Sequence, residues 1–465
     1  MSSSSGTIIA LSILALFLAG YLGQKFLPPP KPTAIGIDLG TTYSCATAFQ
    51  PGTGAILVFK DVFSNKTCIP SIVTFKKNGE ALVGYQAEPY RSSNYQSVLY
   101  DAKRFIGRTF ASADALPYNR YPFQLKVDDE GKPFFSIPAI DDANTMLNIY
   151  PEQVSSAIID YLVKNAVKEL NRPVNAVVLA VPAEFDDDQR AATTKAAEKT
   201  GVKVLRLLNE PTSAAIAYGI HEQQTHKAES TMGAPITSLA VVLDVGGGTT
   251  DVAVLAVRHG TAKGGTSFST LAIAGSNKLG GQDFTNRLQA LIADKLSAMG
   301  RAFAYPREQL RAAAETAKIL LTDDENIEIK VGEDLVKISR TEFDAANFDM
   351  FHRIPRIIQV AIEQSSSSWL MASDEDDADV PKLTPADVAD VVLVGGSTRI
   401  PRIRRMVADL FGGRWPHVTV DPELAVATGA AVQAGTIVGA WPLTVAAVDI
   451  TPSSANRPTK VDVEF

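Results

Sequence analysis

Three glycine-containing turns in the sequence carry residue types that suit phosphate and a divalent cation. GIDLGTT at 36–42 and LDVGGGTTD at 243–251 each place an aspartate at the end of an apolar run, just before glycine and threonine. A third turn, LVGGSTRIP at 393–401, follows another apolar run. Glycine lets backbone N–H groups approach phosphate oxygens closely, and threonine hydroxyls add further donors. Each turn alone is better interpreted as an ordinary hairpin, but the three in this order indicate one shared ligand.

Asp38 and Asp244, one in each of the first two turns, are predicted to face a bound cation. A carboxylate beside a phosphate is unfavourable because the two anions repel each other. Mg²⁺ removes this conflict, since it bridges phosphate oxygens and retains waters that carboxylates can hold. The sequence contains no G-x-x-x-x-G-K-[ST], and the glycines at 246–248 do not fit G-x-G-x-x-G. Neither a P-loop nor a dinucleotide-binding turn is therefore expected.

Strands that alternate with helices must position these turns. Apolar runs typical of buried strands lie at 34–38, 176–182, 239–245 and 391–396. Apolar residues at helical spacing lie between them at 151–171, 187–200, 282–299 and 307–321. This order predicts an α/β fold, and the repeated turn predicts two related lobes. The polar segments 223–235 and 365–379 are expected to be loops, with the acidic run 374–379 in solvent.

The composition is that of a folded protein without a nucleic-acid partner. The 465 residues are 46% hydrophobic and 20% charged, and the formal net charge is −7. Nucleic-acid-binding domains normally carry a basic stripe, whereas the single basic cluster, at 399–405, fits one turn of a helix. Cys45 and Cys68 are the only cysteines, so no disulfide framework is expected. His221 and His226 are spaced unfavourably for a transition-metal site on one helical face.

Residues 1–33 are predicted to be a signal or anchor segment with a proline-rich spacer. Residues 7–22 form an unbroken apolar run, and FLPPPKP follows at 26–32. The run is longer than a usual signal-peptide core and shorter than the roughly 20 residues that span a bilayer, so both alternatives stay open. Membrane contact is expected only through this run, if it is retained. Asn65 begins a glycosylation sequon, and the sequence ends without a KDEL-type signal.

Seven motifs together resemble the ATPase domain of the seventy-kilodalton heat-shock chaperones. In chain order they are IDLGTTYS, YDAKRFIG, NEPTSAAIAYG, LDVGGGTTDV, KLGGQDF, LVGGSTRIP and ATGAAVQAG. The resemblance covers Ala34 to Val445 and is closest to the microsome-associated stress-70 branch, which lacks a peptide-binding domain. It implies an α/β, actin-like (ribonuclease H-like) ATPase fold with two lobes around a nucleotide cleft. The implied division is lobe I at 34–222, lobe II at 223–417, a return to lobe I at 418–445 and a polar tail at 446–465.

At the phosphate end of the cleft, the resemblance implies specific roles for individual residues. Asp38, Glu210 and Asp244 would hold Mg²⁺ through water. Lys103, which residue type alone would assign to the surface, would position the attacking water, and Asp244 would accept its proton. Thr249 would supply a hydroxyl at the second hairpin. The remaining phosphate-binding residues would be Gly40, Thr41, Thr42, Tyr43, Gly246, Gly247, Gly248 and Asp251.

At the adenosine end, Glu315 and Lys318 lie three residues apart on one predicted helix and therefore share a face. The resemblance implies that they grip the ribose, although a surface ion pair explains their spacing equally well. The other residues implied at this end are Thr322, Gly395, Gly396, Ser397, Arg399 and Glu423.

The sequence also departs from the family pattern. Ile319 stands where most members have an arginine stacked on the base, which replaces a cation–π wall with an apolar one. Val245 and Thr250 replace the usual Leu and Phe of the second hairpin and are interpreted as packing changes. Pro182 and Arg190 match the family's relay between the ATP site and the domain interface.

The expected function is that of a slow Mg²⁺-dependent ATPase of the endoplasmic reticulum lumen. It would be a chaperone-type protein that serves protein folding and quality control through partner proteins. ATP or ADP and Mg²⁺ are the expected cofactors, K⁺ is a further candidate, and the chain is expected to be a monomer that does not clamp peptides by itself. A nucleotide-sensing co-chaperone or binding module with negligible turnover is the alternative. Sugar kinases and actin-like filaments share the fold, but the sequence carries no signature of either.

Overall fold

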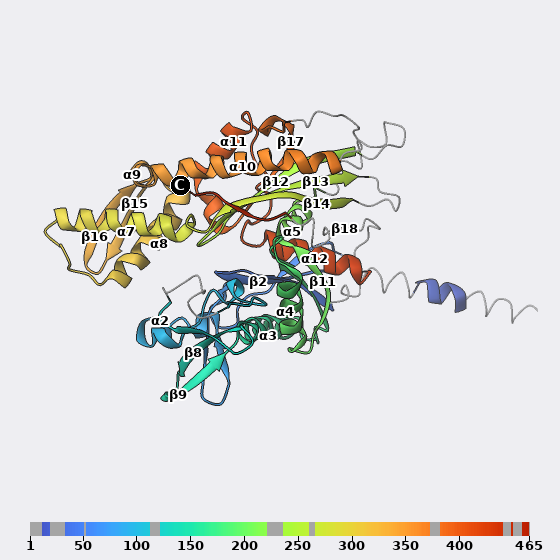
Figure 1. The fold of residues 1–465 in the computed structure, drawn as a ribbon, viewed down its shortest axis with the longest axis horizontal. Coiled ribbons are helices and arrows are strands. Elements are labelled where there is room, and N and C mark those ends of the chain that lie inside the picture. Colours follow the sequence, from blue (N-terminus) through green and yellow to red (C-terminus); the bar gives the residue numbers. More distant parts are fainter. Residues whose placement is uncertain are drawn as a thin grey trace, which may run out of the picture.

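The computed structural model describes residues 12–18, 33–50, 53–111, 121–220, 236–259, 266–372, 382–439, 448–449 and 458–464. Within these ranges the chain forms two lobes, each built on a six-stranded sheet with helices packed against it (Figure 1). The predicted α/β fold is confirmed. None of the helices in this part of the chain has the length and apolar character needed to span a bilayer. The predicted loop at 223–235 and the acidic run at 374–379 lie outside the described residues.

The sheet of the first lobe has the strand order β11-β10-β1-β2-β3, and β4 pairs with β2. Its strands are β1 (Ala34–Leu39), β2 (Tyr43–Phe49), β3 (Ile56–Val58), β4 (Cys68–Pro70), β10 (Ala176–Val181) and β11 (Lys203–Asn209). β1 runs parallel to β10 and antiparallel to β2, and Asp38 pairs with Cys45 across the hairpin. The main helices of this lobe are α3 (Pro151–Leu170), α4 (Asp187–Glu198), α5 (Glu210–Ala217) and α12 (Ala425–Ile437).

The sheet of the second lobe repeats this design, with the order β17-β12-β13-β14-β18 and with β19 paired to β14. Its strands are β12 (Ile236–Val245), β13 (Thr250–His259), β14 (Ser267–Ser276), β17 (Val388–Val394), β18 (Val448–Asp449) and β19 (Val461–Asp462). β12 is antiparallel to β13 and parallel to β17, so Asp244 pairs with Asp251 as Asp38 pairs with Cys45. The internal repeat in the sequence therefore corresponds to two hairpins of the same geometry.

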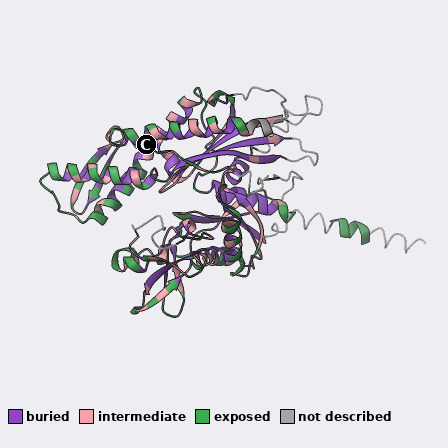
Figure 2. Ribbon diagram, in the orientation of Figure 1, coloured by how far each residue is buried: buried purple, intermediate pink, exposed green. Residues whose placement is uncertain are grey.

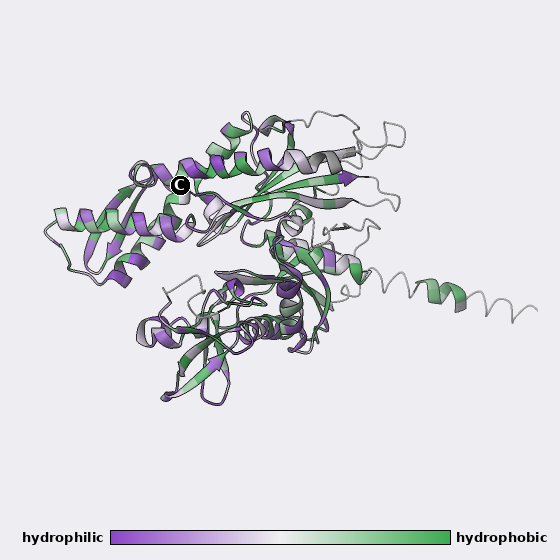
Figure 3. Cartoon of the chain, in the orientation of Figure 1, coloured by the Kyte–Doolittle hydropathy of each residue, from purple (hydrophilic) through white to green (hydrophobic). Residues whose placement is uncertain are grey.

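An arm of helices and a small hairpin extends from the second lobe, at the left of Figure 1. It contains α7 (Gly281–Ala298), α8 (Arg307–Asp323), α9 (Arg340–Ala346), β15 (Asn326–Val331) and β16 (Asp334–Ser339). The helices α10 (Phe348–Ala372) and α11 (Pro401–Leu410) complete this lobe. α10 carries alternating hydrophobic and hydrophilic patches along its length (Figure 3), as expected for a helix with one face on the core.

Short elements fill the rest of the first lobe and connect the strands of the second. The short strands are β5 (Val73–Phe75), β6 (Ala81–Val83), β7 (Gln124–Val127), β8 (Pro133–Ala139) and β9 (Asp142–Ile149). The short helices are α2 (Tyr90–Ser93), η1 (Gly84–Gln86), η2 (Tyr95–Ser97), η3 (Ala102–Arg104), η5 (Pro385–Asp387) and η6 (Gly396–Arg399).

The helix α10 corrects one prediction from the sequence, since it continues through residues 365–372 that were expected to be a loop. Ser365 is buried, and its hydroxyl donates to the Ile362 carbonyl oxygen at 2.7 Å. The Ser366 hydroxyl accepts a hydrogen bond from the Leu383 N–H at 3.0 Å. Because the hydroxyl groups bond to backbone atoms, these serines can be buried in a helix.

The hydrophobic core has three main parts. One belongs to the first lobe and one to the second, and both sheets are buried over most of their length (Figure 2). The third cluster draws side chains from both sheets, including Val178 of β10 and Val242 of β12, together with residues of α5 and α12. Figure 1 places α5 and α12 at the junction of the two lobes. The lobes therefore share one apolar contact, which we call the junction cluster.

Candidate functional site

A cavity of about 1260 Å³ lies between the two lobes and is lined by the predicted glycine turns. Its size suits a ligand as large as a nucleotide. The predicted residues that line it are Asp38, Gly40, Thr41, Thr42, Tyr43, Lys103, Glu210, Asp244, Gly246, Gly247, Gly248, Thr249, Asp251, Gly395, Gly396 and Glu423. Glu315, Lys318, Thr322, Ser397 and Arg399 do not line the cavity. The structure therefore brings the residues of the predicted phosphate end together around one cavity. Most residues of the predicted adenosine end do not line it.

Partly buried carboxyl groups crowd the phosphate end. Burial and the neighbouring Glu210 raise the pKa of Asp38 to about 7. The pKa of Asp244 is raised well above its usual value by burial and by the charges of Asp251, Glu210 and Asp38. Ionising this group of carboxyls together is costly, and a bound cation would offset that cost.

Lys103 supplies positive charge to this group. It lies in the short helix η3, and its ammonium group forms an ion pair with Glu210 at the start of α5. Burial lowers the pKa of Lys103, but the charges of Glu210 and Asp38 raise it more, so the net change is upward. Lys103 therefore stays charged at neutral pH inside the cavity.

Glycine lets the turns pack closely against one another around the cavity. A Cβ on Gly247 would lie 2.9 Å from Thr42 Cγ2, so only glycine lets the two hairpins come this close. Gly395 has φ +82°, and a Cβ there would lie 2.3 Å from the Val245 carbonyl oxygen. The partly buried carboxylates beside these turns fit a magnesium-bound phosphate group. In the part of the chain that the structure describes, no group of three or more His, Cys, Asp or Glu side chains could hold a metal directly.

Glu315 and Lys318 form a brace behind the turns. Lys318 pairs with Glu315 at 2.8 Å and donates to the Gly281 carbonyl oxygen at 3.1 Å. Ser397 donates to the Gly246 carbonyl oxygen at 3.1 Å, which links the third turn to the second. Thr322, predicted at the same end, lies one turn after Lys318 on α8. In this structure the brace contacts the start of α7, where the Gly281 N–H donates to Gly246 of the second turn, and it does not itself line the cavity.

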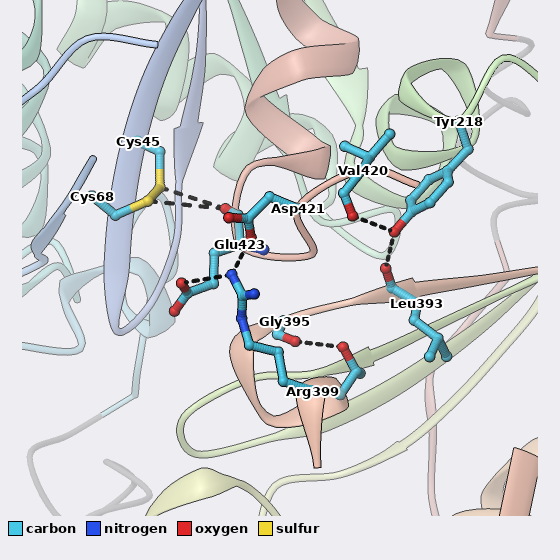
Figure 4. Close-up of polar contacts among 10 residues, drawn as sticks. Cys45, Cys68, Tyr218, Leu393, Gly395, Arg399, Val420, Asp421 and Glu423 are labelled. Carbon is cyan, nitrogen blue, oxygen red and sulfur yellow. Dashed lines mark hydrogen bonds and ion pairs between the residues drawn. A yellow bond between two sulfur atoms is a disulfide. The ribbon is translucent and has the colours of Figure 1, made fainter. Parts of the chain in front are cut away.

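Arg399 joins the third turn to the segment before α12. Its guanidinium group forms ion pairs with Asp421 and, at 3.4 Å, with Glu423 (Figure 4). In the same view the Tyr218 hydroxyl donates to the carbonyl oxygens of Leu393 and Val420 at 3.0 and 3.1 Å. These contacts fix the segment 420–423 against the end of β17.

The two cysteines form a disulfide, which the sequence analysis did not expect. Cys45 and Cys68 face each other across β2 and β4, with their Cα atoms 4.5 Å apart. Both line the cavity, and their sulfur atoms contact the Glu423 carbonyl oxygen at 3.6 and 4.0 Å (Figure 4). The pairing depends on the register of β2 against β4, which two cysteines 23 residues apart in the sequence do not reveal.

Departures from the family pattern have identifiable contacts. Thr250 is buried, and its hydroxyl donates to the Leu279 carbonyl oxygen at 2.8 Å, so its replacement of phenylalanine adds a hydrogen bond to the packing change that was predicted. Ile319 has an exposed fraction of 60%, and Val245 is buried. Arg190 donates to Asn209 Oδ1 at 2.6 Å and to the Pro182 carbonyl oxygen at 3.4 Å. The two predicted relay residues are therefore in direct contact.

Glu184 and Lys460 are among the charged residues of the cavity that the sequence analysis missed. Glu184 lies just after β10 and lines the cavity. Its place at the carboxyl end of a predicted strand was a signal that could have found it. Lys460 reaches the cavity from the last described segment and forms an ion pair with Asp251. No local pattern in the sequence indicates this contact.

Two sheets of the same design, closed around a cavity of glycine turns and carboxylates, define an actin-like fold with a nucleotide cleft. The chain belongs to the Hsp70 family, because the sequence model of the family described as "Hsp70 protein" matches residues 34–463. It is 37% identical to heat shock 70 kDa protein 13 of Homo sapiens over 96% of this chain and 97% of that protein. The proteins of the same name from Bos taurus and Rattus norvegicus match to the same extent.

These comparisons confirm the resemblance to the stress-70 chaperones that the motifs indicated. The Hsp70 family consists of chaperone ATPases that bind adenine nucleotide with Mg²⁺, so an ATP-binding, chaperone-type role follows for this chain. The relationship to heat shock 70 kDa protein 13 is consistent with the predicted place in the endoplasmic reticulum.

Proposed function

We propose that this protein is a slow Mg²⁺-dependent ATPase of the secretory pathway that serves protein quality control through partner proteins. The observation that carries the proposal is the convergence of Lys103 and the partly buried Asp38, Glu210 and Asp244 on one cavity between the lobes. We further propose that it works as a monomer, with lobe I at 34–222, lobe II at 223–417 and a return to lobe I at 418–445.

Asp38, Glu210 and Asp244 would hold Mg²⁺ through its waters, and K⁺ is a further candidate cation of the cleft. When bound, Mg²⁺ neutralises phosphate charge and lowers the pKa of nearby carboxyl groups. Asp244 can accept a proton only in its ionised form, so cation binding and the capacity of Asp244 to act as a base are coupled.

Lys103 would position the attacking water and stabilise the negative charge that builds on the transferred phosphoryl group. Glu210 holds the ammonium group of Lys103 in place. The backbone N–H groups and hydroxyls of residues 40–43 and 246–249 would cradle the phosphates, with Thr249 contributing its hydroxyl. On the adenosine side, Gly395, Gly396 and Glu423 would contact the nucleotide, and Glu315, Lys318, Thr322, Ser397 and Arg399 would reach it only after a closer approach of the lobes.

Phosphate release from radiolabelled ATP tests the proposal. The wild-type protein should release phosphate slowly, and Lys103→Ala should stop the release while ATP still binds. Lys126→Ala, on an exposed strand away from the cavity, is the matched control and should behave as wild type. Tight ATP binding without release by the wild-type protein would support the alternative, a nucleotide-sensing binding module.

A further inference from the structure

The segment 458–464 adds a strand to the second lobe beside the candidate site. β19 pairs in parallel with β14, with Val461 beside Ala274 and Asp462 beside Gly275. The Val463 N–H donates to the Gly275 carbonyl oxygen at 2.8 Å. The Asn277 side-chain amide donates to Asp462 at 3.1 Å and accepts from Lys460 at 3.2 Å. This strand therefore fixes the place at which Lys460 enters the cavity.

Lys460 reaches the second glycine hairpin from this strand. Its ammonium group lies 2.6 Å from Asp251 Oδ1, and the Lys460 side chain has an exposed fraction of only 15%. Asp251 is the cross-strand partner of Asp244. The ion pair therefore involves the residue that lies directly opposite the proposed base on the neighbouring strand.

Gly275 makes room for this ion pair. A Cβ at this position would lie 2.5 Å from Asp251 Oδ1 and 2.7 Å from Lys460 Cε, so both side chains would have to move, and 2.7 Å from the Thr250 carbonyl oxygen, which cannot move easily. The pair is thus seated in a space that β14 leaves open, and Lys460 does not simply lie on the surface. Burial lowers the pKa of Lys460, but the charge and hydrogen bonding of Asp251, with the charges of Glu184 and Asp462, together raise it more, so the ammonium group stays charged.

The charges in the cavity explain what Lys460 does there. Lys103 faces the carboxylates from the first lobe, and Lys460 faces Asp251 and Glu184 from the second. An unpaired Asp251 would repel the charge of Asp244 and would be free to turn toward the phosphates. Pairing with Lys460 balances the charge of Asp251 and holds its carboxylate on the side of β14.

We propose that Lys460 is a positioning residue of the ATPase site, which acts through Asp251 to hold the second phosphate hairpin in its reactive arrangement. This inference rests on the proposed ATPase function. It assigns a part in catalysis to the segment 458–464, which lies outside the three glycine turns.

The test compares the full-length protein with Lys460→Met, Lys460→Arg, Glu464→Gln and a chain that ends at residue 457. Glu464 is exposed on the same segment, so Glu464→Gln is the matched control and should behave as wild type. Lys460→Met and the shortened chain should lower kcat by roughly 10- to 100-fold, the effect of a misplaced reactive group. Their Kd for ADP should stay within about threefold, as expected if the nucleotide pocket is intact, and Lys460→Arg should recover most of kcat because it keeps the charge.

The outcomes separate this inference from the proposed function. A wild-type protein that binds ATP but releases no phosphate would overturn the ATPase function and the inference with it. If the wild-type protein hydrolyses ATP and Lys460→Met has the same kcat, the inference about Lys460 is overturned and the ATPase function stands. If the shortened chain loses activity and Lys460→Met keeps it, the strand matters and its lysine does not, which also contradicts the proposal. Hydrogen exchange of β14 checks that the strand stays docked in Lys460→Met, and a loss of protection there with no recovery in Lys460→Arg would indicate a structural role.

Discussion

The two glycine hairpins of the cleft are built alike but are tied to the rest of the protein differently. Cys45 and Asp251 occupy matching positions, since each is the cross-strand partner of the aspartate that begins its turn. Cys45 is joined covalently to Cys68 on the adjacent β4, whereas Asp251 is paired with Lys460 from a distant part of the sequence. The two hairpins therefore share the aspartate and the glycine turn that line the cavity. They differ in the bond that links each hairpin to the rest of the protein.

The largest expected difference between the hairpins concerns chemistry. Asp244→Asn should lower the single-turnover rate of ATP hydrolysis by roughly 100- to 10,000-fold, because general bases contribute on this order. ATP binding should persist, since the amide keeps the shape of the side chain. Quench-flow measurement of phosphate formation tests this, with the exposed Asp129→Asn as the control. A variant that turns over like the wild type would remove Asp244 from its proposed role.

The covalent attachment of the first hairpin should appear in stability. Closing a loop of this length with a disulfide stabilises a protein by about 3 kcal/mol, mainly by restricting the unfolded chain. Reduction, or the double variant Cys45→Ser and Cys68→Ser, should therefore lower the free energy of unfolding by that amount in urea titrations. Reductant should have no effect on the double variant. Equal stability of the oxidised and reduced wild type would mean that the hairpin is held without the bond.

Both hairpins should give the nucleotide-free protein a stability that depends on pH. The pKa of Asp38 is raised from 3.8 to about 7, and that of Asp244 is raised as well. Between these values the folded state binds more protons than the unfolded state, so stability falls as pH rises from about 4 to about 7. We expect a loss on the order of 2 kcal/mol between pH 5 and pH 7.5, measured by urea unfolding without Mg²⁺.

The matched variants divide this pH effect between the hairpins. Asp38→Asn and Asp244→Asn should each reduce the dependence on pH, because each removes one group that must ionise in the cleft. Saturating Mg²⁺ and ADP should also reduce it. A slope that is unchanged in the double variant would show that other groups cause the fall.

The smallest expected effect concerns the hydroxyl groups beside the turns. Ser44 and Thr250 occupy matching positions, and both are buried. Ser44 forms a hydrogen bond with Ser71 at 2.8 Å, and Thr250 donates to the Leu279 carbonyl oxygen. Ser44→Ala and Thr250→Val should each lower the free energy of unfolding by about 1 kcal/mol, the usual net value of such a bond. A gain in stability from Thr250→Val would mean that its hydroxyl is poorly satisfied.

Features encoded by local sequence were predictable. The apolar runs and the glycine turns placed β1, β10, β12 and β17 and the residues of the phosphate end, because strand burial and turn geometry depend on adjacent residues. The family resemblance added Lys103, which residue type alone would have left on the surface.

Features that depend on tertiary contacts were not predictable. The Cys45–Cys68 bond requires the register of two short strands, and the contact of Lys460 with Asp251 requires the docking of β19 on β14. The helical continuation through Ser365 and Ser366 depends on hydrogen bonds that their hydroxyls make with backbone groups, in one case that of the distant Leu383. The serine-rich composition favoured a loop there, because composition does not reveal the backbone groups with which these hydroxyls form hydrogen bonds.

The junction cluster constrains how the cleft can open. Its apolar side chains come from both sheets, so pulling the lobes straight apart would expose them to water at about 25 cal/mol for each Å². A rotation about the cluster keeps them covered and widens the cavity on the side away from the cluster. We therefore expect the lobes to rotate about α5 and α12. A small rotation at these helices gives a larger displacement at the rim of the cavity.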